Sequence, residues 1–253
     1  MAGTITHVAI ADKIYCILGK DKIKNLPLFF GGNLAPDAIH AKKDYQRIDK
    51  KRSHLCEGIN AYGYLDSEVA KLFKDRVNEF IENYYLTAGD DKDLYLGYIT
   101  HLLADEYHLL EIYKYIEKYA ISNGANPNEL GFRENLQKKT INGGIYEKLF
   151  ADISDTLNIH NVNQCKYDFK QNAVDILESV WDYEIKDYIS AEQINISKRW
   201  VIDTFFKTEP TEDNQYKNNV ADYDYDSVLK LIDNSAEDII ASLSGKKDII
   251  KIL

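Results

Sequence analysis

The amino-acid sequence predicts an all-α protein, a bundle of several helices with no sheet. Only four prolines and thirteen glycines occur in 253 residues, so few positions interrupt a helix. Apolar residues recur at the i, i+3, i+4, i+7 spacing of amphipathic helices, and strand-like alternation is scarce. Both observations favour helices packed on helices, in a single domain that spans residues 1–253.

The N-terminal third contains two apolar helical patterns followed by a polar segment. The first expected helix begins near Thr4 or Thr6, ends before Gly19, and carries His7 at the start of its buried stripe. NLPLFFGG then predicts a short apolar helix. The following LAPD predicts an extended step before Asp37, because a residue that precedes proline avoids the α region. Residues 41–57 are polar and basic, and favour a loop or an irregular helix.

Longer amphipathic patterns fill the rest of the chain. Asp66 or Ser67 is expected to cap a helix that reaches about Tyr84, and a third strong helix runs from about Asp91 to Ala120. Further helical patterns are expected at 144–157, 165–189, 191–207 and, after a polar stretch, 228–243.

The segment GYITHLLADEYHLL places three titratable side chains on one face of the third strong helix. At about 100° per residue, Asp105 lies about 40° from His101 on one side, and His108 lies about 20° from it on the other. That face is expected to point into the protein, where an isolated carboxylate costs several kcal/mol and a metal ion commonly compensates. The alternative is a core network in which both imidazoles hydrogen-bond to tyrosines or to Asp105.

The spacing of these side chains favours two metal ions over one. His101 and Asp105 have Cβ atoms about 5–6 Å apart, whereas His101 and His108 are separated by about 10 Å along the axis. Two ions about 3.5–4 Å apart, with Asp105 between them, fit this spacing. Gly97, one turn before His101, is expected to leave room for metal, water or substrate.

Four segments, taken in order, give the sequence a family resemblance. THVAIAD, GNLAPDAIH, DKKRSHL and GYITHLLADEYH resemble the zinc-dependent phospholipase C family, which is related in fold to the S1/P1 nucleases. In that family a helical bundle holds up to three zinc ions. The resemblance implies a phospholipase C / P1 nuclease fold with its metal site mainly in residues 1–120. The zinc ligands that it implies are His7, Asp37, His54, His101 and Asp105, with Asp105 bridging metals.

The sequence also departs from the family pattern. In the secreted phospholipases the mature N-terminal residue is itself a zinc ligand, released by cleavage of a signal peptide that this chain lacks. Their later histidine lies further beyond the HxxxD pair than His108 does, and the second half of this chain offers no matching acidic ligand. Two metals are therefore expected in preference to three. Iron or manganese also suit imidazole and carboxylate donors.

The resemblance implies a metal-dependent phosphoesterase that hydrolyses a small-molecule or lipid phosphodiester with a metal-activated water. Asp37 is the candidate catalytic carboxylate, which would orient or deprotonate that water. Four basic residues just before His54 are candidates for holding the substrate phosphate, although a charged run is more often a solvated face: Arg47, Lys50, Lys51 and Arg52. His40 is expected at the surface or behind the ligands.

Two other functions remain open. An HD-type metallophosphohydrolase also uses helical His and Asp side chains, but the chain contains no His-Asp dipeptide. A non-catalytic helical binding protein with a degenerate metal site would retain the fold without the later ligands.

Charge and cysteine usage restrict partners and location. With 31 basic and 41 acidic residues, the net charge of −10 argues against binding nucleic acid through bulk charge. No apolar run approaches the roughly 20 residues that span a bilayer, and no signal peptide is recognisable. The cysteines Cys16, Cys56 and Cys165 show no CxxC spacing, so reduced thiols in a cytoplasmic protein are expected.

Overall fold

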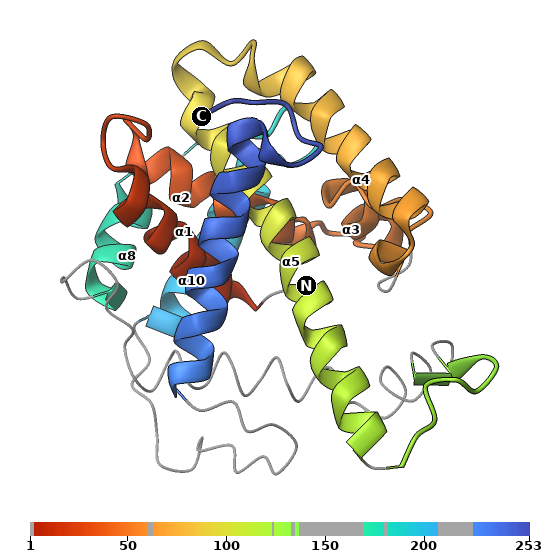
Figure 1. Ribbon diagram of the computed structural model, residues 1–253. Helices are drawn as coiled ribbons and strands as arrows, with labels where there is room; N and C mark the ends of the chain where they lie inside the picture. The colour runs from red at the N-terminus through yellow and green to blue at the C-terminus, as the bar shows by residue number, and fades with distance from the viewer. Residues whose placement is uncertain are drawn as a thin grey trace.

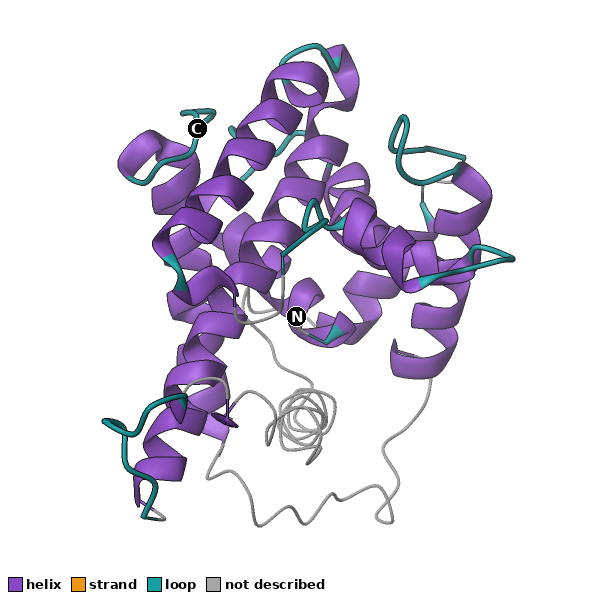
Figure 2. Cartoon of the chain, turned by 90° about the vertical axis from the view of Figure 1, so that its right-hand side faces the viewer, coloured by secondary structure: helices purple, strands orange, loops and turns teal. Residues whose placement is uncertain are grey.

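The computed structural model describes residues 3–59, 63–122, 124–132, 135–136, 169–179, 182–206 and 225–253. Most of the chain in these ranges is helical, and turns and loops connect the helices (Figure 2). The described residues contain no strand, only an isolated bridge between Ile185 and Ile189. The all-α prediction is confirmed. The helix expected at 144–157 lies outside the described residues.

Most of the longer helices begin and end close to where the sequence placed them. Their bounds are α1 (Thr4–Leu18), α2 (Leu26–Leu34), α3 (Arg47–Ser53), α4 (Ser67–Phe80), α5 (Lys92–Ser122), α8 (Phe169–Glu178), α9 (Ala191–Val201) and α10 (Tyr225–Ala241). The helix expected at 165–189 is an exception, because it ends at Glu178 and residues 182–190 form turns and an isolated bridge. Short helical turns include η1 (Ala35–Ala41), which continues directly from α2. The predicted cap of α4 is confirmed, because the Asp66 carboxylate accepts hydrogen bonds from the backbone N–H groups of Glu68 and Val69.

Two local predictions in the N-terminal third are wrong. Ala35 is helical, with φ −60° and ψ −40°, so no extended step precedes Pro36. Ala35 is fully buried and Pro36 occupies the first turn of η1, so packing and a favourable proline position outweigh the ordinary bias. Residues 47–53 form a regular short helix, because the Asp49 carboxylate accepts from the Gln46 backbone N–H at 2.8 Å.

Helix α5 is central to the packing (Figure 1). It contacts α1, α2 and α10, while α9 from the second half of the chain packs against η1. Buried apolar side chains from α1 to α10 belong to one hydrophobic cluster. The site described below is therefore surrounded by segments far apart in sequence.

Glycines bring the backbones of α2 and α5 into direct contact. A Cβ atom added at Gly32 would lie 1.8 Å from the Leu94 carbonyl oxygen, and one added at Gly97 would lie 2.0 Å from that of Phe29. The space beside Gly97 is thus filled by α2, and the expectation that it leaves room for metal or substrate is wrong. This close approach places Asn33 beside His101.

The described residues also bear on membrane insertion and on the cysteines. None of their helices combines the length and the apolar character needed to cross a bilayer. Cys56 is a free, half-buried thiol, but Cys16 is disulfide-bonded, which contradicts the expectation of reduced thiols. Sequence spacing could not reveal this, because a disulfide depends on which residues the fold brings together. Cys165 lies outside the described residues.

Candidate metal centre

Five imidazole and carboxylate side chains from four segments meet between the helices. His7 comes from α1, Asp37 from η1, His54 follows α3, and His101 and Asp105 lie one turn apart on α5. They form two groups of potential ligand atoms, and within each group the atoms lie within 4.8 Å of one another. We call His7, His101 and Asp105 the inner group, and Asp37, His54 and His101 the outer group. His101 belongs to both.

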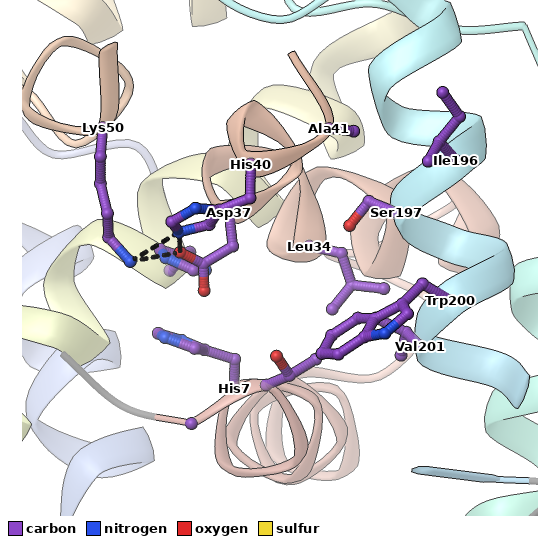
Figure 3. A pocket seen from close by; sticks show the side chains of 13 residues that line it. His7, Leu34, Asp37, His40, Ala41, Lys50, Ile196, Ser197, Trp200 and Val201 are labelled. Atoms are coloured by element: carbon purple, nitrogen blue, oxygen red, sulfur yellow. Dashed lines mark hydrogen bonds and ion pairs between the residues drawn. The ribbon is translucent and has the colours of Figure 1, made fainter. Parts of the chain in front are cut away.

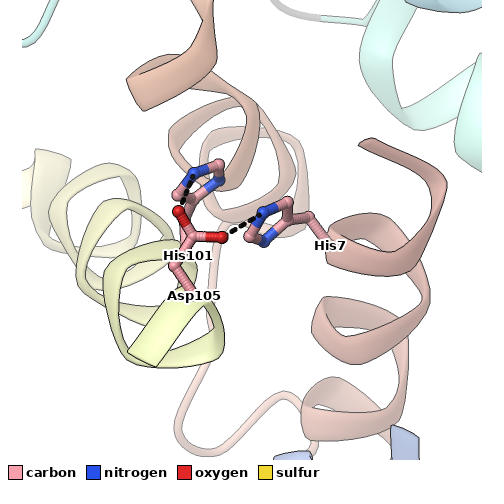
Figure 4. Close-up of side chains that lie close together, drawn as sticks. All are labelled: His7, His101 and Asp105. Atoms are coloured by element: carbon pink, nitrogen blue, oxygen red, sulfur yellow. Dashed lines mark ion pairs between the residues drawn. The ribbon is translucent and has the colours of Figure 1, made fainter. Parts of the chain in front are cut away.

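The side chains of the inner group lie close together between α1 and α5 (Figure 4), and all three are nearly buried. His7 Nε2 lies 3.2 Å from Asp105 Oδ1, and His101 Nε2 lies 3.8 Å from Asp105 Oδ2. The His7 and His101 rings stack, with centroids 3.6 Å apart and planes inclined by 7°. Both histidines are 1% exposed. The group therefore combines a buried carboxylate with two buried imidazoles.

The outer group contacts the inner group through His54 and the common residue His101. His54 Nε2 lies 3.3 Å from both Asp37 Oδ1 and His101 Nε2. It also lies 3.6 Å from Asp105 Oδ2, so the two groups are continuous. The Asp37 side chain is 23% exposed, which makes it the one partly open member.

Hydrogen bonds from outside the groups orient the imidazoles. His101 Nδ1 lies 2.7 Å from the Asn33 carbonyl oxygen, which only accepts, so the proton is on Nδ1. The His101 Nε2 lone pair then points toward Asp105 and His54. The carbonyl oxygen of Lys50, 2.9 Å from His54 Nδ1, favours the same tautomer there. Backbone carbonyls that leave Nε2 as the donor atom are typical partners of metal-ligating histidines.

Electrostatics favours the charge states that a metal requires. Burial lowers the pKa of His101 well below its usual range, so its imidazole is neutral at neutral pH. Burial alone would raise the pKa of Asp37, but the Lys50 ammonium and the His54 imidazole outweigh it and hold that pKa well below the ordinary value. The pKa of Asp105 is also lowered, because nearby positive charge and the hydrogen bond with His7 outweigh its burial. Ionised carboxylates and a neutral imidazole are the forms that bind cations.

Three other predicted site residues are not among these ligand atoms, although His108 lies near enough to His7 and Asp105 for their charges to influence its pKa, which burial lowers well below its usual range. His108 is fully buried on α5, but it belongs to neither group of ligand atoms among the described residues. Its distance along the helix from His101 accounts for this. Arg47 is exposed at the start of α3, and the Arg52 Nε pairs with Glu57 at 3.2 Å. Neither arginine lines the cavity beside the donor groups.

That cavity has a volume of about 560 Å³ and opens on His7, Asp37 and His101 (Figure 3). Its polar end also contains Lys50 and His40, and α9 forms the opposite wall. Sequence reasoning missed the contribution of α9 and the position of His40. The only sequence signal for α9 was a pair of large apolar residues four apart, which an ordinary amphipathic helix also shows.

Comparison with known proteins adds no relative: no family model, curated protein or solved structure matches the chain. The fold and the site show a helical protein in which five buried or half-buried histidine and aspartate side chains, which could hold a metal ion, lie beside a cavity.

Proposed function

We propose that this protein is a metal-dependent phosphoesterase, similar to the zinc-dependent phospholipase C family, that hydrolyses a phosphodiester. The observation that carries the proposal is the pair of donor groups that share His101 and border a cavity. Imidazole and carboxylate donors suit zinc, and iron or manganese would use the same ligands. The proposed ligands are the inner and outer groups; His108, Arg47 and Arg52 are not included.

The five residues fit a two-cation centre in their chemistry. Four of them are nearly buried, and the lone pair of His101 Nε2 points at Asp105, a direction that a cation between them would satisfy. When bound, two divalent cations supply a Lewis acid that activates water and neutralises charge on a phosphoryl group.

The protein's own side chains would orient the water, hold the histidine rings and bind the substrate. Asp37 reaches the cavity, and its salt bridge with Lys50 keeps it ionised, so it accepts a hydrogen bond from a water and orients that water toward the substrate. Asn33 and Lys50 fix the histidine rings through their carbonyl oxygens. A cavity of this volume suits a small phosphodiester or a lipid headgroup.

The decisive experiment measures metal content and hydrolysis together. Purified protein should contain zinc, iron or manganese by elemental analysis and should hydrolyse bis(4-nitrophenyl) phosphate. Asp105→Asn should lose most of the metal and the activity. Glu106→Gln is the matched control, because Glu106 is the next acid on α5 and belongs to neither donor group. Only trace metal in the wild type, or equal retention in both variants, would overturn the proposal.

The same measurement separates catalysis from binding. Metal retained without hydrolysis in the presence of added zinc, manganese or iron would favour a helical binding protein with a metal site. The cytoplasmic location expected from the sequence remains a prediction, and the disulfide at Cys16 weighs against it.

A further inference from the structure

The second wall of the cavity comes from α9 and is apolar apart from Ser197. Ile196, Trp200 and Val201 line it, together with Leu34 at the end of α2. Ile196 and Trp200 are four residues apart, so they lie on the same side of the helix. They are 47% and 54% exposed, whereas Val201 is buried. The cavity thus presents a half-exposed indole and an isoleucine opposite the donor groups.

The indole extends into the cavity from α9, and Asp37 and Lys50 lie across from it (Figure 3). Trp200 offers a flat apolar surface that favours stacking against another ring. A half-exposed tryptophan beside polar donors is the arrangement found where a ligand is partly apolar and partly charged. The wall therefore indicates that a ligand there carries more than a phosphate.

The polar end of the cavity contains a fixed ammonium. Lys50 Nζ lies 2.9 Å from Asp37 Oδ1 and 3.2 Å from His40 Nε2, and its side chain is 18% exposed. An ammonium has three N–H donors, so one remains beyond these two partners in the described part of the chain. Unlike the exposed Arg47 and Arg52, Lys50 borders the cavity itself. It is placed to meet an anionic oxygen beside the donor groups.

We propose that the cavity binds a phosphate ester bearing a planar apolar group, with the anionic end at Lys50 and the planar group against Trp200. This inference rests on the proposed function for the nature of the anion, and it defines the substrate class of that site. Ile196 and Leu34 would contact the edges of the planar group.

Two non-hydrolysable probes test this inference without requiring turnover. Phenylphosphonate and methylphosphonate carry the same anionic group and differ in the ring. Calorimetric titration of the zinc-loaded full chain should show phenylphosphonate binding roughly tenfold more tightly. The chain has two tryptophans, so in a Trp181→Phe background Trp200 is the only one left. With excitation that selects tryptophan over tyrosine, phenylphosphonate should change its emission more than methylphosphonate does.

Substitutions assign the two ends of the ligand. Trp200→Ala should bring the ratio of the two affinities close to one while methylphosphonate binding stays the same, and Trp200→Phe should retain most of the preference. Leu72→Ala is the control, because Leu72 is also exposed, at 44%, but lies outside the cavity. Lys50→Met should weaken both probes by a similar factor, whereas Lys51→Met, the neighbouring lysine, should not.

The outcomes distinguish this inference from the proposed function. Equal affinity for both probes in the wild type, or an unchanged ratio in a folded Trp200→Ala protein, would overturn the planar subsite. Equal loss in Lys50→Met and Lys51→Met would overturn the role of Lys50. A phenyl preference that depends on Trp200, in a protein that hydrolyses no phosphodiester, would support this subsite while contradicting the proposed activity.

Discussion

The inner and outer donor groups differ in the exposure of their carboxylates. The side chains of the inner group are 1%, 1% and 7% exposed for His7, His101 and Asp105. In the outer group Asp37 is 23% exposed and already carries a salt bridge with Lys50 at 2.9 Å. Both groups border the cavity, the inner one through His7 and His101, but only the outer group has an appreciably exposed carboxylate.

This difference suggests a division of roles. Deep enclosure favours tight retention of a cation, because every replacement of its ligands requires the helices to separate. A partly open carboxylate allows a ligand or water to approach from the cavity. We therefore expect the inner group to contribute mostly to metal retention and the outer group mostly to substrate contact. The one lone pair of His101 Nε2 can bind a single cation, whereas the two oxygens of Asp105 face His7 and His54, so Asp105 is the side chain that can serve both.

Removing Asp105 should have the largest effect. Asp105→Ala should abolish binding at both groups, with metal affinity falling by at least about 100-fold, because its two carboxylate oxygens face His7 and His54. His7→Ala should weaken only the inner cation, and His54→Ala only the outer one. Elemental analysis after dialysis, together with zinc titration, measures the number of ions retained by each variant.

His40→Ala serves as the control for these three variants. His40 lines the cavity but belongs to neither donor group, so its loss should leave the metal content unchanged. Identical stoichiometry in the three ligand variants would show that the division into two groups is wrong.

Moving His101 without replacing any of the donor side chains should have the next largest effect. In Gly97→Ala the new methyl group would lie 2.0 Å from the Phe29 carbonyl oxygen and 2.7 Å from the Asn33 nitrogen. We expect a loss of about 1–3 kcal/mol in the free energy of unfolding, measured by urea denaturation. Because α2 must move away, the Asn33 carbonyl should leave His101 Nδ1 and the metal content should fall.

Gly89→Ala provides the comparison, since an added Cβ there meets no atom within 4 Å. Its φ of +59° makes the substitution strained, but it should leave metal binding intact. A stable, fully metallated Gly97→Ala protein would contradict the packing described between α2 and α5.

The helices and their buried faces could be predicted because they depend on local periodicity. The α5 face that contains His101 and Asp105 followed from helix geometry alone, and the resemblance pointed to His7, Asp37 and His54, which the structure places within the same cluster. Their role as metal ligands stays a prediction. The capping that makes residues 47–53 a regular helix was also present in the sequence, as a glutamine three residues before an aspartate, but it was not recognised.

The remaining features depend on contacts between distant segments. No local pattern indicates that α9 faces η1, so neither Trp200 nor the apolar wall could be assigned to the site. The same limit explains Gly97, whose missing side chain accommodates another backbone. It also explains why the sequence named four basic phosphate candidates but could not single out Lys50 as the one that lines the cavity.

Asp12 belongs to neither donor group, and replacing it should have the smallest effect of these substitutions. Like Asp105 it is a buried carboxyl, but burial raises its pKa to about 7, against the weaker influence of Lys13. Between about pH 4 and pH 7 the unfolded chain releases this proton while the folded chain keeps it, so stability falls as pH rises through this window.

Asp12→Asn should remove this dependence. Relative to the wild type, the variant should gain on the order of 2 kcal/mol in the free energy of unfolding at pH 8. It should gain little at pH 4, because this pH lies close to the pKa of an unfolded aspartate and the difference in bound protons has hardly accumulated. Asp21→Asn, at an exposed aspartate, should show no such gain. Urea denaturation at the two pH values measures the difference, and the metal content should stay the same in both variants. A loss of metal in Asp12→Asn would contradict the assignment of the ligands, because Asp12 belongs to neither donor group.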